Sequence, residues 1–227
     1  MDAAATGSST ADVRRIALLG GSFDPVHNGH VAVAHYVSVL LAPDEVRILP
    51  AGNPYQKQPL TASAEDRIAM LELALRDLRL PLTIDRREID RKGPTYTIDT
   101  LRDLRAEVGM RASLTLVIGA DQLQRLDTWR DWSGLFDHAH ICVVSRPGYT
   151  TESAELPDAV RREFSRRAGT PAQLRATPHS LTYIATALAM DVSSTLLRAE
   201  LRQGKHPGST LPPTVLDYIQ QHHLYRN

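Results

Sequence analysis

The sequence predicts an α/β fold: a Rossmann-like, doubly wound, mostly parallel sheet with helices on both faces and a small C-terminal helical part. Two observations predict the sheet and its covering helices. Short continuous apolar runs such as RIALLGG are typical of strands buried on both faces. Amphipathic helical patterns lie between these runs, and the two patterns alternate at the spacing of βαβ units.

Strands and helices are therefore expected to take turns along the 227 residues. The expected strands are residues 15–21, 45–52, 82–89, 113–121, 140–148 and 181–188. The expected helices are residues 30–42, 63–78, 95–109, 193–204 and 212–224. Ser63, followed by an acid three residues later, is typical of a helix start. Thr97 is the expected N-cap of the helix that Gly109 ends.

One domain is expected over residues 14–227, after a disordered N-terminal tail of residues 1–13. Residues 150–180 are polar and rich in arginine, and they interrupt the alternation as a helical or loop excursion. Residues 191–227 form the expected C-terminal helical part.

Composition limits the classes of function. The formal net charge is zero, which argues against a broad basic surface for nucleic acid. The single cysteine, Cys142, excludes an internal disulfide, and its apolar setting predicts a core residue rather than a nucleophile. No apolar run reaches the length of a membrane span, and the N-terminus lacks a secretory pattern. A cytoplasmic protein without a membrane partner is expected, and the oligomeric state stays open.

The stretch GGSFDPVHNGH follows the first expected strand. Gly20 and Gly21 end that strand, where glycine lets the backbone approach a ligand closely. A helix that starts within the stretch offers free N–H groups and a positive dipole end to an anion. His27 and His30 are three residues apart, so both can face the same side and donate to phosphate oxygens, and Gly29 between them adds no side chain. This combination favours a phosphate site.

Other interpretations of the two histidines are a helix cap, solvated side chains or a pair of metal ligands. No neighbouring Cys or further His completes a metal site, so no metal held by the protein alone is expected. The stretch also lacks the G-x-G-x-x-G pattern of dinucleotide folds and the G-K-[ST] pattern of P-loops.

GGSFDPVHNGH resembles the signature of the His-x-Gly-His nucleotidyltransferase superfamily. Further segments resemble, in order, those of the bacterial nicotinate-nucleotide adenylyltransferase family: NPYQK, GPTYTIDTL, VIGADQL, DTWRDW, VVSRPGY, DVSSTLLR and VLDYIQQHHLY. The resemblance runs from about Arg15 to Arg226. It implies that ATP and nicotinate mononucleotide react to give deamido-NAD and pyrophosphate, with Mg²⁺ entering with ATP.

The resemblance also implies the residues of the site. The expected catalytic donors and cations are His27, His30, Lys57 and Arg198, because this transfer requires positioning and neutralisation of charge. The expected ATP-binding residues are Gly20, Gly21, Ser22, Phe23, Gly29, Gly119, Asp121, Ser193, Ser194 and Thr195. The expected nicotinate-mononucleotide-binding residues are Tyr96, Thr97 and Trp129. No general base is expected, because the acceptor phosphate is already ionised.

Several of these residues keep a second interpretation. Lys57 can be an ordinary exposed loop lysine, and the family's loop often has Pro-His where this chain has Tyr55-Gln56. Asp121 can accept from ribose hydroxyls, cap a helix, or do both. Without the resemblance, residues 193–198 would be a Ser/Thr helix cap with a surface arginine, and Trp129 would be a core residue. Arg146 is a further candidate for the cleft.

Two other functions remain open at this point. One is a sister adenylyltransferase that acts on phosphopantetheine, against which PTYT and DTWRDW argue. The other is a catalytically silent nucleotide-binding module, against which the intact His27, Gly29 and His30 argue. Pyrophosphate release from ATP with a panel of acceptors distinguishes the three.

Overall fold

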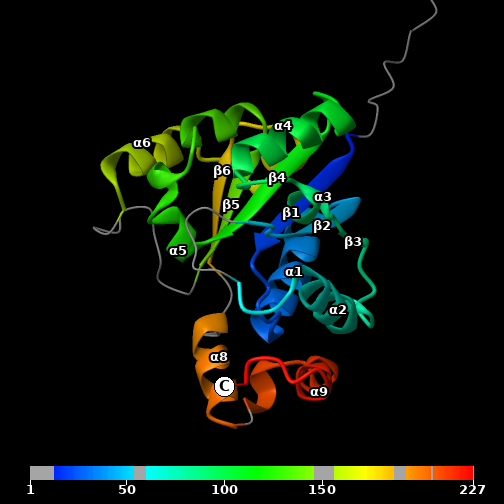
Figure 1. Ribbon diagram of the computed structural model, residues 1–227. Helices are drawn as coiled ribbons and strands as arrows, with labels where there is room; N and C mark the ends of the chain where they lie inside the picture. The colour runs from blue at the N-terminus through cyan, green and yellow to red at the C-terminus, as the bar shows by residue number, and fades with distance from the viewer. Residues whose placement is uncertain (1–12, 54–59, 146–155, 187–192, 206, 227) are drawn as a thin grey trace, which may run out of the picture.

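The computed structural model describes residues 13–53, 60–145, 156–186, 193–205 and 207–226. Six strands form one sheet in the order β3-β2-β1-β4-β5-β6, and every pairing between them is parallel (Figure 1). The strands are β1 (Arg15–Gly21), β2 (Glu45–Pro50), β3 (Leu82–Ile84), β4 (Ser113–Gly119), β5 (His140–Ser145) and β6 (Thr182–Thr186). The predicted doubly wound sheet is confirmed. Its order reverses between β1 and β4, where the carboxyl ends of the strands leave a crevice for ligands.

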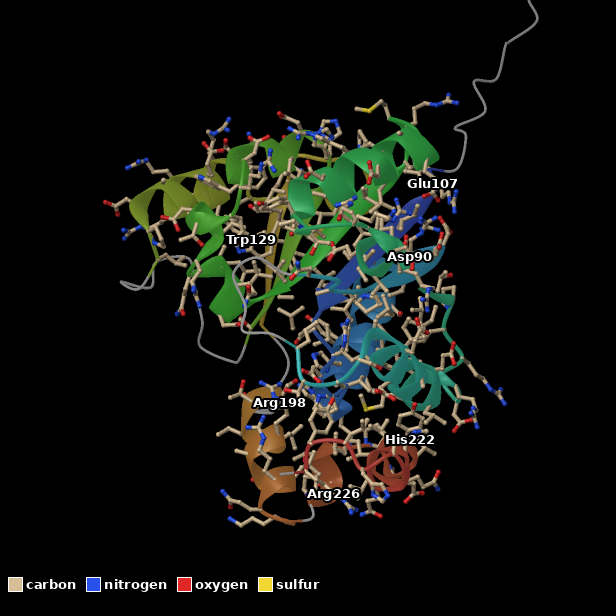
Figure 2. The ribbon with its side chains drawn as sticks, in the orientation of Figure 1. Asp90, Glu107, Trp129, Arg198, His222 and Arg226 are labelled. Carbon is tan, nitrogen blue, oxygen red and sulfur yellow. The ribbon has the colours of Figure 1, made fainter. Side chains whose placement is uncertain are left out.

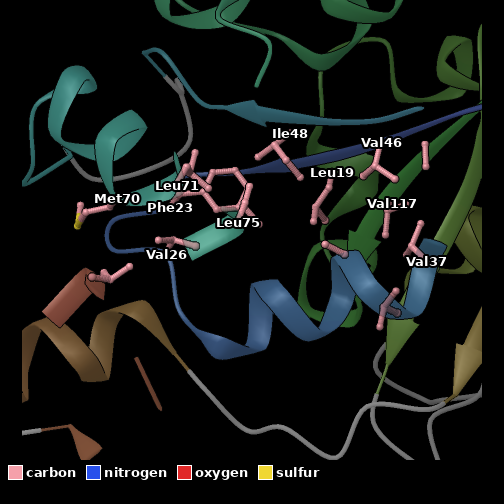
Figure 3. Close-up of a cluster of buried hydrophobic side chains, with 14 of the residues drawn as sticks. Leu19, Phe23, Val26, Val37, Val46, Ile48, Met70, Leu71, Leu75 and Val117 are labelled. Atoms are coloured by element: carbon pink, nitrogen blue, oxygen red, sulfur yellow. The ribbon is translucent and has the colours of Figure 1, made fainter. Parts of the chain in front are cut away.

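Helices cover both faces of the sheet. One face carries α1 (Asn28–Leu41), α2 (Ala64–Leu75) and α7 (Pro171–Ala176). The other carries α4 (Thr97–Val108), α5 (Ala120–Leu123), α6 (Asp158–Arg166) and the 3₁₀ turns η1 (Leu126–Thr128) and η2 (Trp132–Asp137). Successive side chains of β1 point to opposite faces of the sheet, and each face has its own hydrophobic core. Ala17 and Leu19 pack in the first core, and Ile16 and Leu18 pack in the second. Figure 3 shows the first core, in which Leu19, Val37 and Leu71 belong to β1, α1 and α2.

The C-terminal part consists of α8 (Ser194–Arg202), η3 (Gly208–Thr210) and α9 (Pro213–Gln221). Figure 1 shows these helices beyond the end of the sheet, next to α1 and α2. Leu197 of α8 and Val215 of α9 are buried in the same core as α1 and α2. None of the helices in the described ranges is long and apolar enough to span a membrane.

The described part of the excursion at residues 150–180 is mostly helical. It contains α6 and α7, which bury Phe164 and Leu174 against opposite faces of the sheet. Most of the predicted tail, together with Lys57 and Arg146, lies outside the described residues.

Two local predictions are wrong. Residues 82–89 form a short β3 followed by α3 (Arg87–Asp90), because the Asp85 carboxylate accepts from the backbone N–H of Arg87 at 3.0 Å and turns the chain. Tyr96, not Thr97, is the N-cap of α4, since the Tyr96 carbonyl accepts the first helical hydrogen bond, from the N–H of Thr100. The predicted caps Ser63 and Gly109 are confirmed.

Cys142 is a core residue of β5, as predicted. Burial raises the pKa of its thiol to about 12, so the thiolate that a nucleophile needs is suppressed.

Candidate active site

A cavity of about 330 Å³ lies at the switch point of the sheet. It is lined by the ends of β1 and β4 and by parts of α1, α3 and α4. The predicted site residues that line it are Gly20, Gly21, Ser22, His30, Thr97, Gly119, Asp121 and Trp129. Eight of the residues predicted from the sequence thus line the same cavity.

The two histidines begin α1 and hold each other. His27 is the N-cap, and its ring Nδ1 accepts from the backbone N–H of His30 at 3.3 Å. The ring Nδ1 of His30 accepts in return from the backbone N–H of His27 at 3.2 Å. The rings are stacked with their centroids 3.7 Å apart. Because both Nδ1 atoms accept, each neutral ring carries its proton on Nε2 and presents a single N–H donor.

His27 differs from His30 in its surroundings. His30 lines the cavity, whereas the side chain of His27 is not among the lining residues and His27 is only 6% exposed. Burial lowers the pKa of His27 to about 4, so its ring is neutral at pH 7. At neutral pH, protonation therefore does not strengthen hydrogen-bond donation by His27.

Local packing explains two of the glycines. A Cβ at Gly119 would lie 2.5 Å from Oδ1 of Asp121, so glycine makes room for that carboxylate to fold back at the end of β4. A Cβ at Gly21 would lie 3.0 Å from the Phe23 ring, which packs edge-on against His30 with the ring centroids 4.8 Å apart. Phe23 itself is buried and acts as a support for the His30 ring.

One end of the cavity is formed by the start of α4 and by Trp129. Thr97 is the first residue of α4, and the first N–H groups of a helix have no acceptor within the helix. Trp129 follows η1 and lines the same cavity. Tyr96 is not among the lining residues, and the Arg130 guanidinium lies over its ring at 4.6 Å. The prediction that Tyr96 binds the acceptor therefore stays a prediction.

The start of α8 contacts the chain segment that leads to the histidines. Ser194 Oγ donates to the carbonyl of Pro25 at 3.2 Å, and Arg198 Nη1 donates to the carbonyl of Asp24 at 2.6 Å. Figure 2 shows Arg198 on α8 and Trp129 in the body that contains the sheet. The predicted site residues in the described ranges that do not line the cavity are Phe23, His27, Gly29, Tyr96, Ser193, Ser194, Thr195 and Arg198.

Three residues that were not predicted from the sequence contribute to the cavity or to the segment before the histidines. Glu88 lines the cavity from α3, and its Oε1 accepts from the hydroxyl of Thr100 at 2.9 Å. Thr95 also lines it, with a buried Oγ1 that has no hydrogen-bond partner in the structure. Asp24 is 2% exposed and supports the segment before the histidines. Glu88 could not be predicted, because residues 82–89 have the pattern of one strand. Thr95 and Asp24 lie inside two of the motifs described above, GPTYTIDTL and GGSFDPVHNGH.

Comparison with known proteins gives consistent results. The cytidylyltransferase-like family matches residues 18–200. A protein of Herminiimonas arsenicoxydans named "probable nicotinate-nucleotide adenylyltransferase" is 56% identical over 94% of this chain and 98% of its own length. A protein of the same name from Laribacter hongkongensis is 43% identical over 93% and 94%.

A solved structure shares the fold. It is the nicotinic acid mononucleotide adenylyltransferase of Plasmodium falciparum in complex with NaAD, which superposes with a TM-score of 0.71 at 16% identity. The superposition covers 93% of this chain and 97% of that one.

Proposed function

This chain belongs to the nicotinate-nucleotide adenylyltransferase family, and from that premise we propose how its residues bind ATP and nicotinate mononucleotide and join them. The enzyme transfers the adenylyl group of ATP to nicotinate mononucleotide. The products are deamido-NAD (nicotinate adenine dinucleotide) and pyrophosphate, and the reaction belongs to NAD biosynthesis.

His30 is the central donor of the proposed site. Its Nδ1 accepts from the backbone N–H of His27, and the ring lines the cavity, where its Nε2–H is the donor proposed for a phosphate oxygen of ATP. His27, neutral and buried, holds the His30 backbone and stacks beneath its ring. Gly20, Gly21 and Ser22 line the cavity beside His30 and offer backbone close to the phosphates. Negative charge that grows on the α-phosphate thus meets pre-positioned donors.

The remaining lining residues hold the nucleosides. Asp121 is placed to accept from ribose hydroxyls of ATP, and Gly119 leaves the room for it. The first amide groups of α4 at Thr97 face the ring carboxylate of nicotinate mononucleotide, and Trp129 stacks on its pyridine ring. Residues at the ends of β1 and β4 form a further part of the cavity wall.

Ser193, Ser194, Thr195 and Arg198 form the proposed second contact with the phosphates, together with Lys57. Support for this comes from the tie between α8 and the histidine segment, which brings a helix start and a guanidinium to that segment. Phe23 is buried and packs against the His30 ring, and Gly29 and Phe23 remain proposed ATP-binding residues.

Mg²⁺ is proposed to enter on the phosphates of ATP. Within the described ranges no three His, Cys, Asp or Glu side chains are placed together to hold a metal ion. Cavity carboxylates Glu88 and Asp121 are oxygen donors of the kind that Mg²⁺ accepts beside substrate phosphates and water. When bound, the ion neutralises charge on the phosphates.

The transfer itself needs no protein base. A phosphate oxygen of nicotinate mononucleotide attacks the α-phosphorus of ATP, the new P–O bond forms, and the bond to the bridging oxygen of the β-phosphate breaks. The bonding electrons leave with pyrophosphate. The protein's part is to align the two phosphates and to stabilise their charge.

The cytoplasm, where ATP is available, is the proposed location.

The observation that carries this proposal is the meeting of Ser22, His30, Thr97, Asp121 and Trp129 around one cavity at the switch point. The test is pyrophosphate release from ATP and Mg²⁺ with three acceptors, nicotinate mononucleotide, nicotinamide mononucleotide and phosphopantetheine, and in a control without an acceptor. Release should be fastest with nicotinate mononucleotide. Faster release with phosphopantetheine, or equal release without an acceptor, would contradict the proposal.

A further inference from the structure

The end of the chain contacts the segment that joins β1 to α1. Tyr225 is 4% exposed, and its hydroxyl donates to Oδ1 of Asp24 at 2.7 Å across a sequence separation of 201 residues. The Asp24 carboxylate also accepts from the backbone N–H of Thr61 at 2.7 Å and from that of Ala62 at 3.1 Å. Burial, followed by this hydrogen bond to Asp24, raises the pKa of Tyr225, so the phenol keeps its proton.

Three more hydrogen bonds join the C-terminal part to this region, two to the same segment and one to Asn28, the first residue of α1. Arg198 donates to the carbonyl of Asp24 and Ser194 to that of Pro25. The Asn28 side chain donates to the carbonyl of Ser209 at 2.6 Å. From the other side, Arg67 Nη1 donates to the carbonyl of Ser22 at 2.9 Å. The segment is thus held at Ser22, Asp24 and Pro25 by side chains distant in sequence.

This segment connects two halves of the proposed site. Gly20–Ser22, on its N-terminal side, line the cavity, and His27 and His30 follow on its C-terminal side. A displacement of Asp24 would therefore move the His30 ring relative to the backbone of Gly20–Ser22. Misplacement by 1 Å can cost about a hundredfold in rate.

We propose that Tyr225 is a positioning residue for adenylyl transfer: its hydrogen bond to Asp24 sets the place of the His27–His30 pair relative to the glycine turn. The proposal rests on the function proposed above. It gives Tyr225 a part in turnover, although Tyr225 does not line the cavity.

A matched control lies in the same part of the chain. The hydroxyl of Tyr218 on α9 donates to Oδ1 of Asp66 at 3.0 Å and joins α9 to α2. This pair resembles the Tyr225–Asp24 pair in chemistry, but Asp66 belongs to α2 and not to the segment before the histidines. Tyr218→Phe therefore removes a comparable bond without touching that segment.

The experiment compares Tyr225→Phe, Tyr218→Phe and the wild type. Tyr225→Phe should lower kcat about tenfold while the KM values for ATP and nicotinate mononucleotide change less than about threefold, because alignment is lost and not the binding surface. Tyr218→Phe should leave kcat unchanged. The imidazole ¹H–¹⁵N signals of His27 and His30 should shift in Tyr225→Phe only, while those of His140 on β5 stay in place and report an intact fold.

Asp24→Ala removes the acceptor of the Tyr225 hydroxyl and should reproduce the shift of the two imidazole signals, which decides the matter if Tyr225→Phe folds poorly. Unchanged imidazole signals in both variants would overturn the positioning role, and so would equal losses of kcat in Tyr225→Phe and Tyr218→Phe. The imidazole signals do not depend on turnover. A wild type without adenylyl transfer would therefore refute the proposed function separately.

Discussion

At the scale of single residues, the hydrogen bonds of the histidine pair define its chemistry. His27 and His30 exchange backbone N–H bonds through their Nδ1 atoms, which fixes the Nε2–H tautomer of both rings. The pKa of His27 is lowered to about 4 by burial. His27 is therefore an uncharged support for His30 at neutral pH, and the acid–base behaviour of the enzyme should reflect this.

A first prediction concerns the pH profile. Between pH 5 and 9, kcat should show no limb from His27, whose pKa of about 4 lies below this range, and no limb from a protein base. Loss of rate on the acid side should follow ionisation of the acceptor phosphate, whose second pKa is near 6 for a phosphate ester. The measurement is kcat against pH for the wild type, Glu88→Gln and Asp121→Asn. A limb that vanishes in one carboxylate variant with ATP binding intact would contradict the mechanism.

At the scale of elements, the first residue of α4 and a buried arginine later in the same helix have different roles. Thr97 lies at the cavity, whereas Arg105, two turns further, is 4% exposed and donates to backbone carbonyls of other segments. Its four acceptors are the carbonyls of His138, Gly109, Ala112 and Pro178. We propose that the start of α4 governs the choice of acceptor and that Arg105 contributes to stability.

A second prediction concerns choice of acceptor. Nicotinate mononucleotide carries a ring carboxylate, and the N–H groups at the start of α4 suit an anion better than the amide of nicotinamide mononucleotide. The lost ionic hydrogen bonds should cost roughly 2–4 kcal/mol, so kcat/KM should favour the acid by at least about tenfold. Trp129→Ala should weaken both acceptors and leave their ratio nearly unchanged, because stacking serves either ring. Equal kcat/KM for the two acceptors would refute the specificity.

A third prediction concerns Arg105. Arg105→Met leaves up to four carbonyls without their donor and should lower the free energy of unfolding by about 3 kcal/mol or more. Arg102→Ala on the same helix is the control. Arg102 is half-exposed and pairs with Asp99 and Asp131, so its loss should cost less than about 1 kcal/mol. Urea unfolding of both variants measures the difference, and similar costs would show that Arg105 has no special role.

At the scale of the whole molecule, two buried neutral histidines couple stability to pH. His140 in β5 is fully buried, with its Nε2 2.7 Å from the carbonyl of Thr177 and its Nδ1 accepting from the N–H of Leu181. Burial lowers its pKa to about 4, as for His27. In the unfolded chain both titrate near 6.5. Between these pH values the unfolded state holds more protons, so the free energy of unfolding rises with pH there.

A fourth prediction follows from this coupling. Acidification from pH 7 to pH 4.5 should lower the free energy of unfolding by up to about 3 kcal/mol for each of the two histidines. Carboxylates held by arginines contribute at lower pH, because the pKa of Glu107 is lowered from 4.5 to about 2 by Arg47 and Arg87. Urea unfolding at pH 4.5, 5.5 and 7 should show a flatter dependence in His140→Gln than in His35→Ala, which changes an exposed histidine of α1. Equal slopes would contradict the account.

Much of the fold could be predicted because its signals are local. Apolar runs such as Arg15–Gly21 and caps such as Ser63 depend on neighbouring residues, and the alternation of strands and helices then restricts the topology. The glycine turn, His30, Asp121 and Trp129 came from motifs, and the sheet order brings them together.

The rest of the site depends on contacts distant in sequence. Nothing near Tyr225 indicates that its hydroxyl reaches Asp24, and nothing near Glu88 indicates that α3 turns it into the cavity. The burial that keeps His27 neutral is likewise set by tertiary packing. The division of 14–227 as a single domain stays a prediction.

The most direct test of the central claim is the turnover of His30→Ala with ATP, Mg²⁺ and nicotinate mononucleotide. The claim is that the His30 ring, a hydrogen-bond donor at the switch point, stabilises the transferring phosphate. Loss of one such donor typically costs about 3–4 kcal/mol, so kcat should fall about a hundredfold to a thousandfold while the circular dichroism spectrum stays that of the wild type. His35→Ala on the same helix should turn over normally. Near-normal kcat in His30→Ala would contradict the account.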